Sequence, residues 1–227
     1  MKVPKTIGVI MDGNRRFARE RNLPLLEGHR QGADKLKEFL RWTKEAGVEN
    51  VIVWAFSTEN WKRAPEEVTY LLNLMRDLFK NEIDSFLKED GVLKFIGNIK
   101  RFPEDLQRIL HEAEEKSKGN TGLNLYVALS YGGRDEIINA VKNIVSENPP
   151  LPTITEEYVG KHMMTEAMPD PDLIIRTSGE KRLSGFLPWQ GVYSELFFID
   201  SYWPAFTKEE FDSVLKEYEK RERRFGA

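Results

Sequence analysis

The chain alternates between short apolar runs and longer segments in which apolar residues recur every three or four positions. The short runs, rich in β-branched residues, predict strands at residues 7–11, 51–56, 92–96, 123–129, 173–175 and 196–199. The helical spacing predicts helices at residues 28–46, 66–88, 103–117, 134–145 and 207–224, a short helix capped by Thr155, and one that begins after residues 12–14. We therefore expect an α/β fold with a mostly parallel central β-sheet flanked by helices, in a single domain over residues 1–227.

Polar residues gather in the loops after four of these strands, at residues 12–14, 57–61, 130–134 and 176–184. In a parallel sheet the carboxyl ends of the strands share one rim, and ligands usually bind there. The first loop opens a helix that carries Arg15 and Arg16 in its first turn. Unpaired N–H groups at a helix start, together with arginines, suit a phosphate or diphosphate.

Asp12 precedes these arginines, and its carboxylate would repel a phosphate unless a divalent cation such as Mg²⁺ lay between them. The alternative is that Asp12 only caps the helix. Arg176, Arg182 and Ser184 form a second candidate anion site, whose alternative is a mobile surface loop. His29 could donate to a phosphate oxygen or relay a proton, although a lone histidine is more often structural.

The predicted helix at residues 66–88 has an apolar arc that Leu74 and Leu78 widen beyond the stripe needed for packing on one sheet face. This excess could line an apolar cavity, or a second helix could pack alongside it.

The composition narrows the range of functions. The 227 residues include no cysteine, which excludes disulfides, thiolate catalysis and cysteine-based metal sites, and only three histidines. A net charge of −3 argues against a broad basic face for nucleic acid and leaves small phosphorylated ligands as the better match. The first residues show no signal-peptide pattern and no apolar run is long enough to span a membrane, so we expect a cytoplasmic protein whose membrane contact would be peripheral.

The sequence resembles the cis-prenyltransferase family through motifs that follow the family's order along almost the whole chain. The motifs are MDGNRRFA at 11–18, GH at 28–29, FSTENW at 56–61, YGGR at 131–134, DLIIRTSGE at 172–180, RLS at 182–184, WQ at 189–190, YSEL at 193–196 and RERRFG at 221–226. The resemblance implies a homodimeric, Mg²⁺-dependent enzyme that adds isopentenyl diphosphate to an allylic diphosphate primer, forming a Z double bond each time. It also implies an apolar tunnel between sheet and helices and peripheral membrane contact for release of the lipid product. The sequence has neither a P-loop nor a broad basic surface, so we expect no nucleic-acid partner.

Matching positions imply a role for each motif residue. The implied catalytic residues are Asp12, Asn14, His29, Ser57 and Asn60; the substrate-binding residues are Gly13, Arg15, Arg16, Phe17, Trp61, Arg63, Arg176, Arg182 and Ser184; and the Mg²⁺ ligands are Asp12 and Glu195. Ala55, the long helix and Leu123 would set the product length, while Tyr70 and Phe79 could shorten the tunnel.

Three departures from the family pattern put the primer in doubt between farnesyl and geranylgeranyl diphosphate. Arg15 stands where the family has a second glycine, and Leu25 stands where many relatives have an arginine. The segment at residues 184–190 reads SGFLPWQ where the family usually has SNFLLWQ. The proton acceptor is also open between the departing diphosphate and a network of Asn14, His29 and Ser57. A non-catalytic partner subunit and a short-chain Z-prenyl diphosphate synthase are the alternatives to a long-chain synthase.

Overall fold

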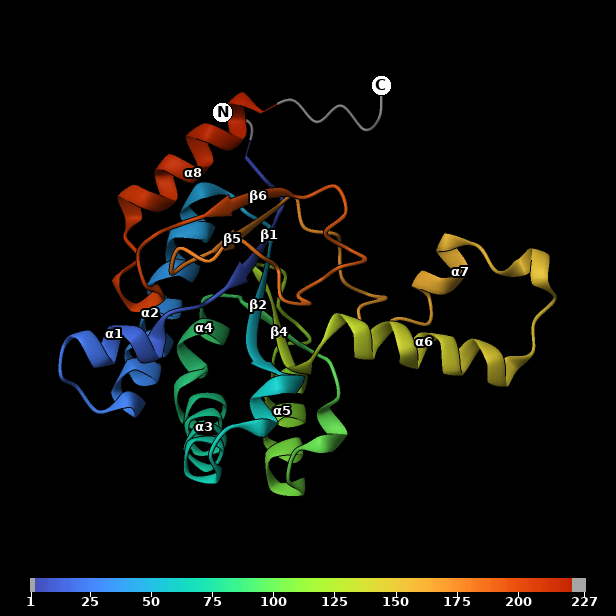
Figure 1. The fold of residues 1–227 in the computed structure, drawn as a ribbon, viewed down its shortest axis with the longest axis horizontal. Helices are drawn as coiled ribbons and strands as arrows, with labels where there is room; N and C mark the ends of the chain where they lie inside the picture. Colours follow the sequence, from blue (N-terminus) through green and yellow to red (C-terminus); the bar gives the residue numbers. More distant parts are fainter. Residues whose placement is uncertain (1–2, 222–227) are drawn as a thin grey trace.

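Six parallel strands form the centre of the protein in a computed structural model that describes residues 3–221 (Figure 1). The strands are β1 (Thr6–Ile10), β2 (Asn50–Ser57), β3 (Val92–Ile96), β4 (Asn124–Tyr131), β5 (Leu173–Arg176) and β6 (Glu195–Phe198). They lie in the order β3-β4-β2-β1-β5-β6, and every pairing is parallel. The predicted α/β fold is confirmed.

Helices follow the strands in alternation. They are α1 (Asn14–Glu20), α2 (Leu25–Ala46), α3 (Pro65–Asp77), α4 (Asp84–Lys88), α5 (Glu104–Lys116), α6 (Gly133–Glu147), α7 (Glu156–Gly160) and α8 (Lys208–Lys220), with short 3₁₀ turns at Thr58–Lys62, Ile99–Arg101, Leu151–Thr153 and Trp203–Ala205. Apolar residues of α2, α3, α5 and α8 pack against one face of the sheet in one continuous core. The chain around Phe186 and Leu187 covers the other face, and α6 and α7 project from the body as an arm (Figure 1).

The predicted helix at residues 66–88 is wrong in one respect, because it is interrupted. Helix α3 ends at Asp77, a π-helical segment (η2, Leu78–Glu82) follows, and the α-helical pattern returns only in α4. The π segment closes wider i→i+5 turns while apolar residues continue through it at near-helical spacing. The apolar pattern therefore predicted one helix.

The C-terminal helix also ends earlier than predicted. Arg221 has an extended backbone (φ −80°, ψ 131°), so α8 stops at Lys220, and the guanidinium of Arg221 pairs with Glu195 at 2.8 Å. The predicted continuation through residues 222–224 lies outside the described residues. The remaining predicted elements are present, with shifted ends.

Two glycines bring the start of α1 close to α2. A Cβ on Gly28 would lie 2.1 Å from the carbonyl oxygen of Asn14, and one on Gly32 would lie 2.2 Å from the Asn14 side-chain oxygen. Neither distance is possible for real atoms, so only glycine permits this approach. It fixes the loop after β1 against α2, where the candidate site lies.

Candidate active site

Asp12 follows β1 at the rim of the sheet and is held by its own loop and by the end of β5. Its Oδ1 accepts a hydrogen bond from the Gly13 amide at 2.7 Å, and its Oδ2 accepts one from Arg176 at 2.9 Å. Thr177 donates to its carbonyl oxygen at 2.7 Å. The residue that caps α1 is Gly13 (φ 100°), and no side chain forms a capping bond there. The interpretation of Asp12 as a helix cap therefore does not describe this geometry.

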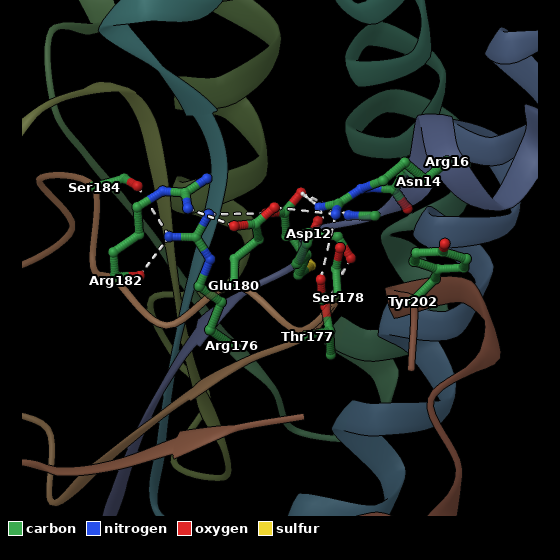
Figure 2. Close-up of polar contacts among 12 residues, drawn as sticks. Asp12, Asn14, Arg16, Arg176, Thr177, Ser178, Glu180, Arg182, Ser184 and Tyr202 are labelled. Atoms are coloured by element: carbon green, nitrogen blue, oxygen red, sulfur yellow. Dashed lines mark hydrogen bonds and ion pairs between the residues drawn. The ribbon is translucent and has the colours of Figure 1, made fainter. Parts of the chain in front are cut away.

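The two predicted anion sites lie side by side around Asp12 (Figure 2). Arg176 is only 5% exposed; it donates to the Ser184 hydroxyl at 2.9 Å as well as to Asp12. Arg16 approaches Asp12 at 3.5 Å and Glu180 at 3.1 Å. Arg182 also pairs with Glu180, so this carboxylate joins the two sites.

Glu180 was not among the predicted site residues, yet its carboxylate pairs with both Arg16 and Arg182. The only signal in the sequence was an acidic residue between Arg176 and Arg182 in a loop that otherwise suited anions. In the structure Glu180 and Asp12 are the counter-ions of the arginines (Figure 2). A diphosphate would replace carboxylate oxygens at guanidinium groups that are already in place.

Several buried polar atoms near this rim have no hydrogen-bond partner among residues 3–221. They are Asn14 Oδ1, His29 Nε2, Arg176 Nε and Ser178 Oγ. Buried polar groups are normally paired, so a cluster of exceptions indicates a site that a ligand completes. Asn14 and His29 line the same cavity as Asp12 and Arg176.

The electrostatic surroundings of His29 keep its ring neutral. Burial and the nearby positive charge of Arg63 lower the pKa of His29 to about 4, and Glu67 only partly offsets this. The ring Nε2 lies 3.5 Å from the Glu67 carboxylate. A neutral imidazole beside an anion site can donate a hydrogen bond to a ligand, or accept one from it, without adding a fixed charge.

The loop after β2 also reaches the site. Asn60 accepts a hydrogen bond from the Ser57 amide at 3.0 Å in a capping box, and both residues line the cavity together with Arg63. Trp61 instead packs edge-on against Phe56 and donates to Ser130 at 3.0 Å. Trp61 is not on the cavity wall.

Three predicted site residues do not line the cavity. Arg15 pairs at 3.6 Å with Glu67, the carboxylate beside His29, and Phe17 is buried. Glu195 opens β6 opposite Leu173, three residues before Arg176 in β5, which places it about 10 Å along the strand from Arg176. Residues 3–221 contain no cluster of three or more histidine, aspartate or glutamate side chains that could hold a metal.

An apolar cavity of about 490 Å³ begins at the rim. Ala55, Leu125 and Val127 line it from the sheet, and α2, α3, η2 and α4 line it from the helical side. Phe79 lies on its wall as predicted, whereas Tyr70 does not. Leu123 is buried and does not itself line the cavity, whereas Leu125, two residues further along the chain, does. The predicted role of Leu123 in product length stays a prediction.

Paired anion sites at the mouth of an apolar cavity define a class of protein that binds ligands with an anionic head and an apolar tail. In keeping with this class, the sequence matches the prenyltransferase family described as "Putative undecaprenyl diphosphate synthase" over residues 10–226. The chain belongs to this family, as its motifs predicted.

Individual relatives match over almost their full length. The chain is 45% identical over 231 residues to an isoprenyl transferase of Clostridium acetobutylicum, covering 99% of this chain and 90% of the relative. It is 42% identical over 229 residues to the ditrans,polycis-undecaprenyl-diphosphate synthase ((2E,6E)-farnesyl-diphosphate specific) of Micrococcus luteus, covering 99% and 92%. The crystal structure of lavandulyl diphosphate synthase from Lavandula x intermedia in complex with dimethylallyl diphosphate matches with a TM-score of 0.95 and 30% identity, covering 99% of both chains.

Within residues 3–221, no helix combines the length and the apolar character needed to cross a membrane.

Proposed function

We propose that the protein elongates a prenyl chain by successive Z-condensation of isopentenyl diphosphate onto an allylic diphosphate primer, farnesyl or geranylgeranyl diphosphate. The product is a long-chain polyprenyl diphosphate such as undecaprenyl diphosphate, and each step releases diphosphate. The observation that carries this proposal is the pair of anion sites around Asp12 at the mouth of the apolar cavity. The reaction needs two diphosphates side by side and an apolar space for the growing tail.

The arginines divide between the two substrates in this proposal. Arg16, beside Asp12, would hold the allylic diphosphate, whose leaving group gains negative charge as its carbon–oxygen bond breaks. Arg176, Arg182 and Ser184 would hold isopentenyl diphosphate so that its alkene faces the allylic carbon. The C2 proton then passes to the departing diphosphate or to the Asn14, His29 and Ser57 group.

Mg²⁺ is part of the proposal, and the residues present fit it. Mg²⁺ is commonly held by one or two carboxylates together with substrate phosphates and waters. Asp12 offers such a carboxylate, 31% exposed beside Arg16 and Arg176. A bound Mg²⁺ would neutralise charge on the diphosphate. Glu195 lies three residues along the sheet from the level of Arg176, away from the Asp12 rim. Within one chain it would therefore not share a Mg²⁺ with Asp12.

A homodimer is also proposed, because α6 presents an uncovered apolar stripe. Ile138, Val141 and Val145 recur at helical spacing and are 52%, 47% and 71% exposed, on the arm that projects from the body (Figure 1). A second copy would remove this stripe from water. Light scattering of the unmodified protein should give the mass of a dimer. Val141→Glu should halve this mass, and the neighbouring charge change Lys142→Glu should leave it unchanged. A monomeric mass for the unmodified protein would refute the homodimer.

The remaining part of the proposal is the location of the protein. The lipid product must reach a membrane, so we propose a cytoplasmic enzyme with a peripheral contact at the membrane surface. Binding to phospholipid vesicles, measured by flotation with and without substrates, tests this contact.

The decisive experiment incubates purified protein with Mg²⁺, labelled isopentenyl diphosphate and, separately, farnesyl or geranylgeranyl diphosphate. Asp12→Ala should abolish the long Z-polyprenyl products, while Asp212→Ala, which removes a surface carboxylate paired with Lys208, should not. Circular dichroism checks that both variants fold. No incorporation by a folded, unmodified protein would favour the partner-subunit alternative, and short products alone would favour the short-chain synthase.

A further inference from the structure

The wall of the apolar cavity contains a charged stretch between α2 and the π segment η2. Lys37 of α2 and Glu82 of η2 both line the cavity. The Glu82 carboxylate accepts hydrogen bonds from Lys37 and from Arg30, the latter at 2.7 Å. The two cations come from α2, so Glu82 connects η2 to α2 by charge.

This cluster extends through the wall to the outer surface. Asp34 pairs with Lys37 at 3.0 Å and Asp77 pairs with Arg30 at 3.2 Å; these two carboxylates are 50% and 48% exposed, and neither lines the cavity. Ion pairs that are open to water on the outer surface therefore hold α2 and η2 together. We call this stretch, made of Arg30, Lys37 and Glu82, the charged seam.

The electrostatics of the charged seam agree with this geometry. The hydrogen bond to Glu82 raises the pKa of Arg30 above its ordinary value. Burial lowers the pKa of Lys37, but its hydrogen bonds to Glu82 and Asp34 outweigh this, so the pKa is raised overall. Both cations therefore stay charged and keep the seam closed near neutral pH.

The backbone beside the seam is also the place where the long helix is broken. The π segment Leu78–Glu82 separates α3 from α4, and it carries both Phe79 and Glu82 into the cavity wall. Single π turns inside helices frequently occur at functional sites. The change of hydrogen-bond pattern therefore falls at the segment that faces α2 across Glu82.

The volume of the cavity limits how much of a prenyl chain it can hold. An apolar cavity of about 150 Å³ holds one benzene ring, so a cavity of 490 Å³ holds about twenty carbons, or about four isoprene units. A long-chain polyprenyl product exceeds this space. Its chain must either expand the cavity or leave through the wall.

We infer that the growing chain leaves the cavity through the charged seam between α2 and η2, and that Glu82 sets product length by holding this seam closed. The inference rests on the proposed function, since it concerns the product of that reaction. Apolar wall segments elsewhere would lose close packing if they parted. The seam loses ion pairs whose members water can solvate.

Cross-linking the seam tests the inference directly, because the chain has no cysteine of its own. A Lys37→Cys/Glu82→Cys variant is joined with a cleavable bis-methanethiosulfonate reagent, and products are compared before cross-linking, after it, and after reduction. We expect the locked protein to stop at about four isoprene units, with long products restored by reduction. The matched control is Arg76→Cys/Asp105→Cys, which joins α3 to α5 where the native side chains pair at 2.6 Å away from the cavity; its products should not change.

A second variant removes charge without a cross-link. Glu82→Gln keeps the side-chain shape but weakens both pairs, and we expect its mean product to be longer by at least one isoprene unit. Locked and unlocked proteins with the same long products would overturn the inference while the proposed function stands. Unmodified protein that stops at about four isoprene units would also overturn it, since no exit is then needed. Absence of any product from unmodified protein would instead refute the proposed function.

Discussion

His29 offers a direct measurement of the electrostatics at the candidate site. Its side chain is 11% exposed, and burial together with Arg63 lowers its pKa to about 4 from an ordinary 6.5. In the unfolded chain the same imidazole binds a proton below pH 6.5. The folded protein therefore loses stability as the pH falls from 6.5 towards 4, by about 3 kcal/mol in full and about 2 kcal/mol at pH 5.

Two experiments check this value. Urea unfolding at pH 7.5 and pH 5 should show that the unmodified protein loses about 2 kcal/mol more than His29→Gln over this interval. In carbon–proton NMR spectra the three histidines give few signals, and the variant assigns that of His29. His162 is an internal contrast, because its hydrogen bonds to the Tyr158 carbonyl and to Glu147 raise its pKa.

The site also predicts how a ligand changes this titration. A diphosphate bound beside His29 adds negative charge that favours the imidazolium, so Mg²⁺ with inorganic diphosphate should raise its pKa. A His29 signal that titrates near 6.5 in the free protein, or equal pH dependence of stability in both proteins, would refute the reasoning about burial.

Three further predictions concern the cavity and the packing around it. Leu125→Ala should lengthen the products because it removes wall atoms, and should do so more than Leu123→Ala, which removes none; chromatography of the products by chain length distinguishes them. Gly28→Ala should lower the free energy of unfolding by about 1–3 kcal/mol in denaturant titrations, because the new Cβ would collide with the backbone of Asn14. The control Gly119→Ala should change it by less than about 1 kcal/mol, because no atom lies within 4 Å of the new Cβ. Glu136 is 1% exposed and accepts several hydrogen bonds, so Glu136→Leu should cost about 3 kcal/mol by the same measurement, and an unchanged midpoint would contradict this.

The order of the elements and the rim could be predicted because both follow from local pattern. Apolar runs marked the strands, and parallel pairing then brought their loops together: Ile10 of β1 lies opposite Arg176 of β5, so Asp12 meets a guanidinium 164 residues away. The position of Glu195 could not be predicted in this way. Its motif identified the residue, but only the register of β6 shows that it begins a strand whose other end faces the rim.

The π segment was beyond prediction for a different physical reason. Spacing of apolar residues reports which face of a helix is buried, and Met75, Phe79 and Ile83 satisfy that spacing whether or not the backbone widens between them. The hydrogen bonds that distinguish the two cases belong to the backbone. Glu82 is the part of the sequence that conflicts with the pattern, as a charge on an apolar stripe.

In the proposed function two diphosphates share one rim, and the charges around Asp12 are arranged to permit this. Three guanidinium groups close together would repel one another, and here Asp12 and Glu180 hold them apart in fixed positions. Each carboxylate contacts two arginines, so none of these arginines depends on a ligand for its place. Substrate binding would exchange one set of ion pairs for another. Less side-chain conformational entropy would be lost than if the arginines had to be ordered on binding. Because Glu180 contacts both Arg16 and Arg182, we expect a diphosphate that displaces it from one arginine to change the affinity of the other for the second diphosphate.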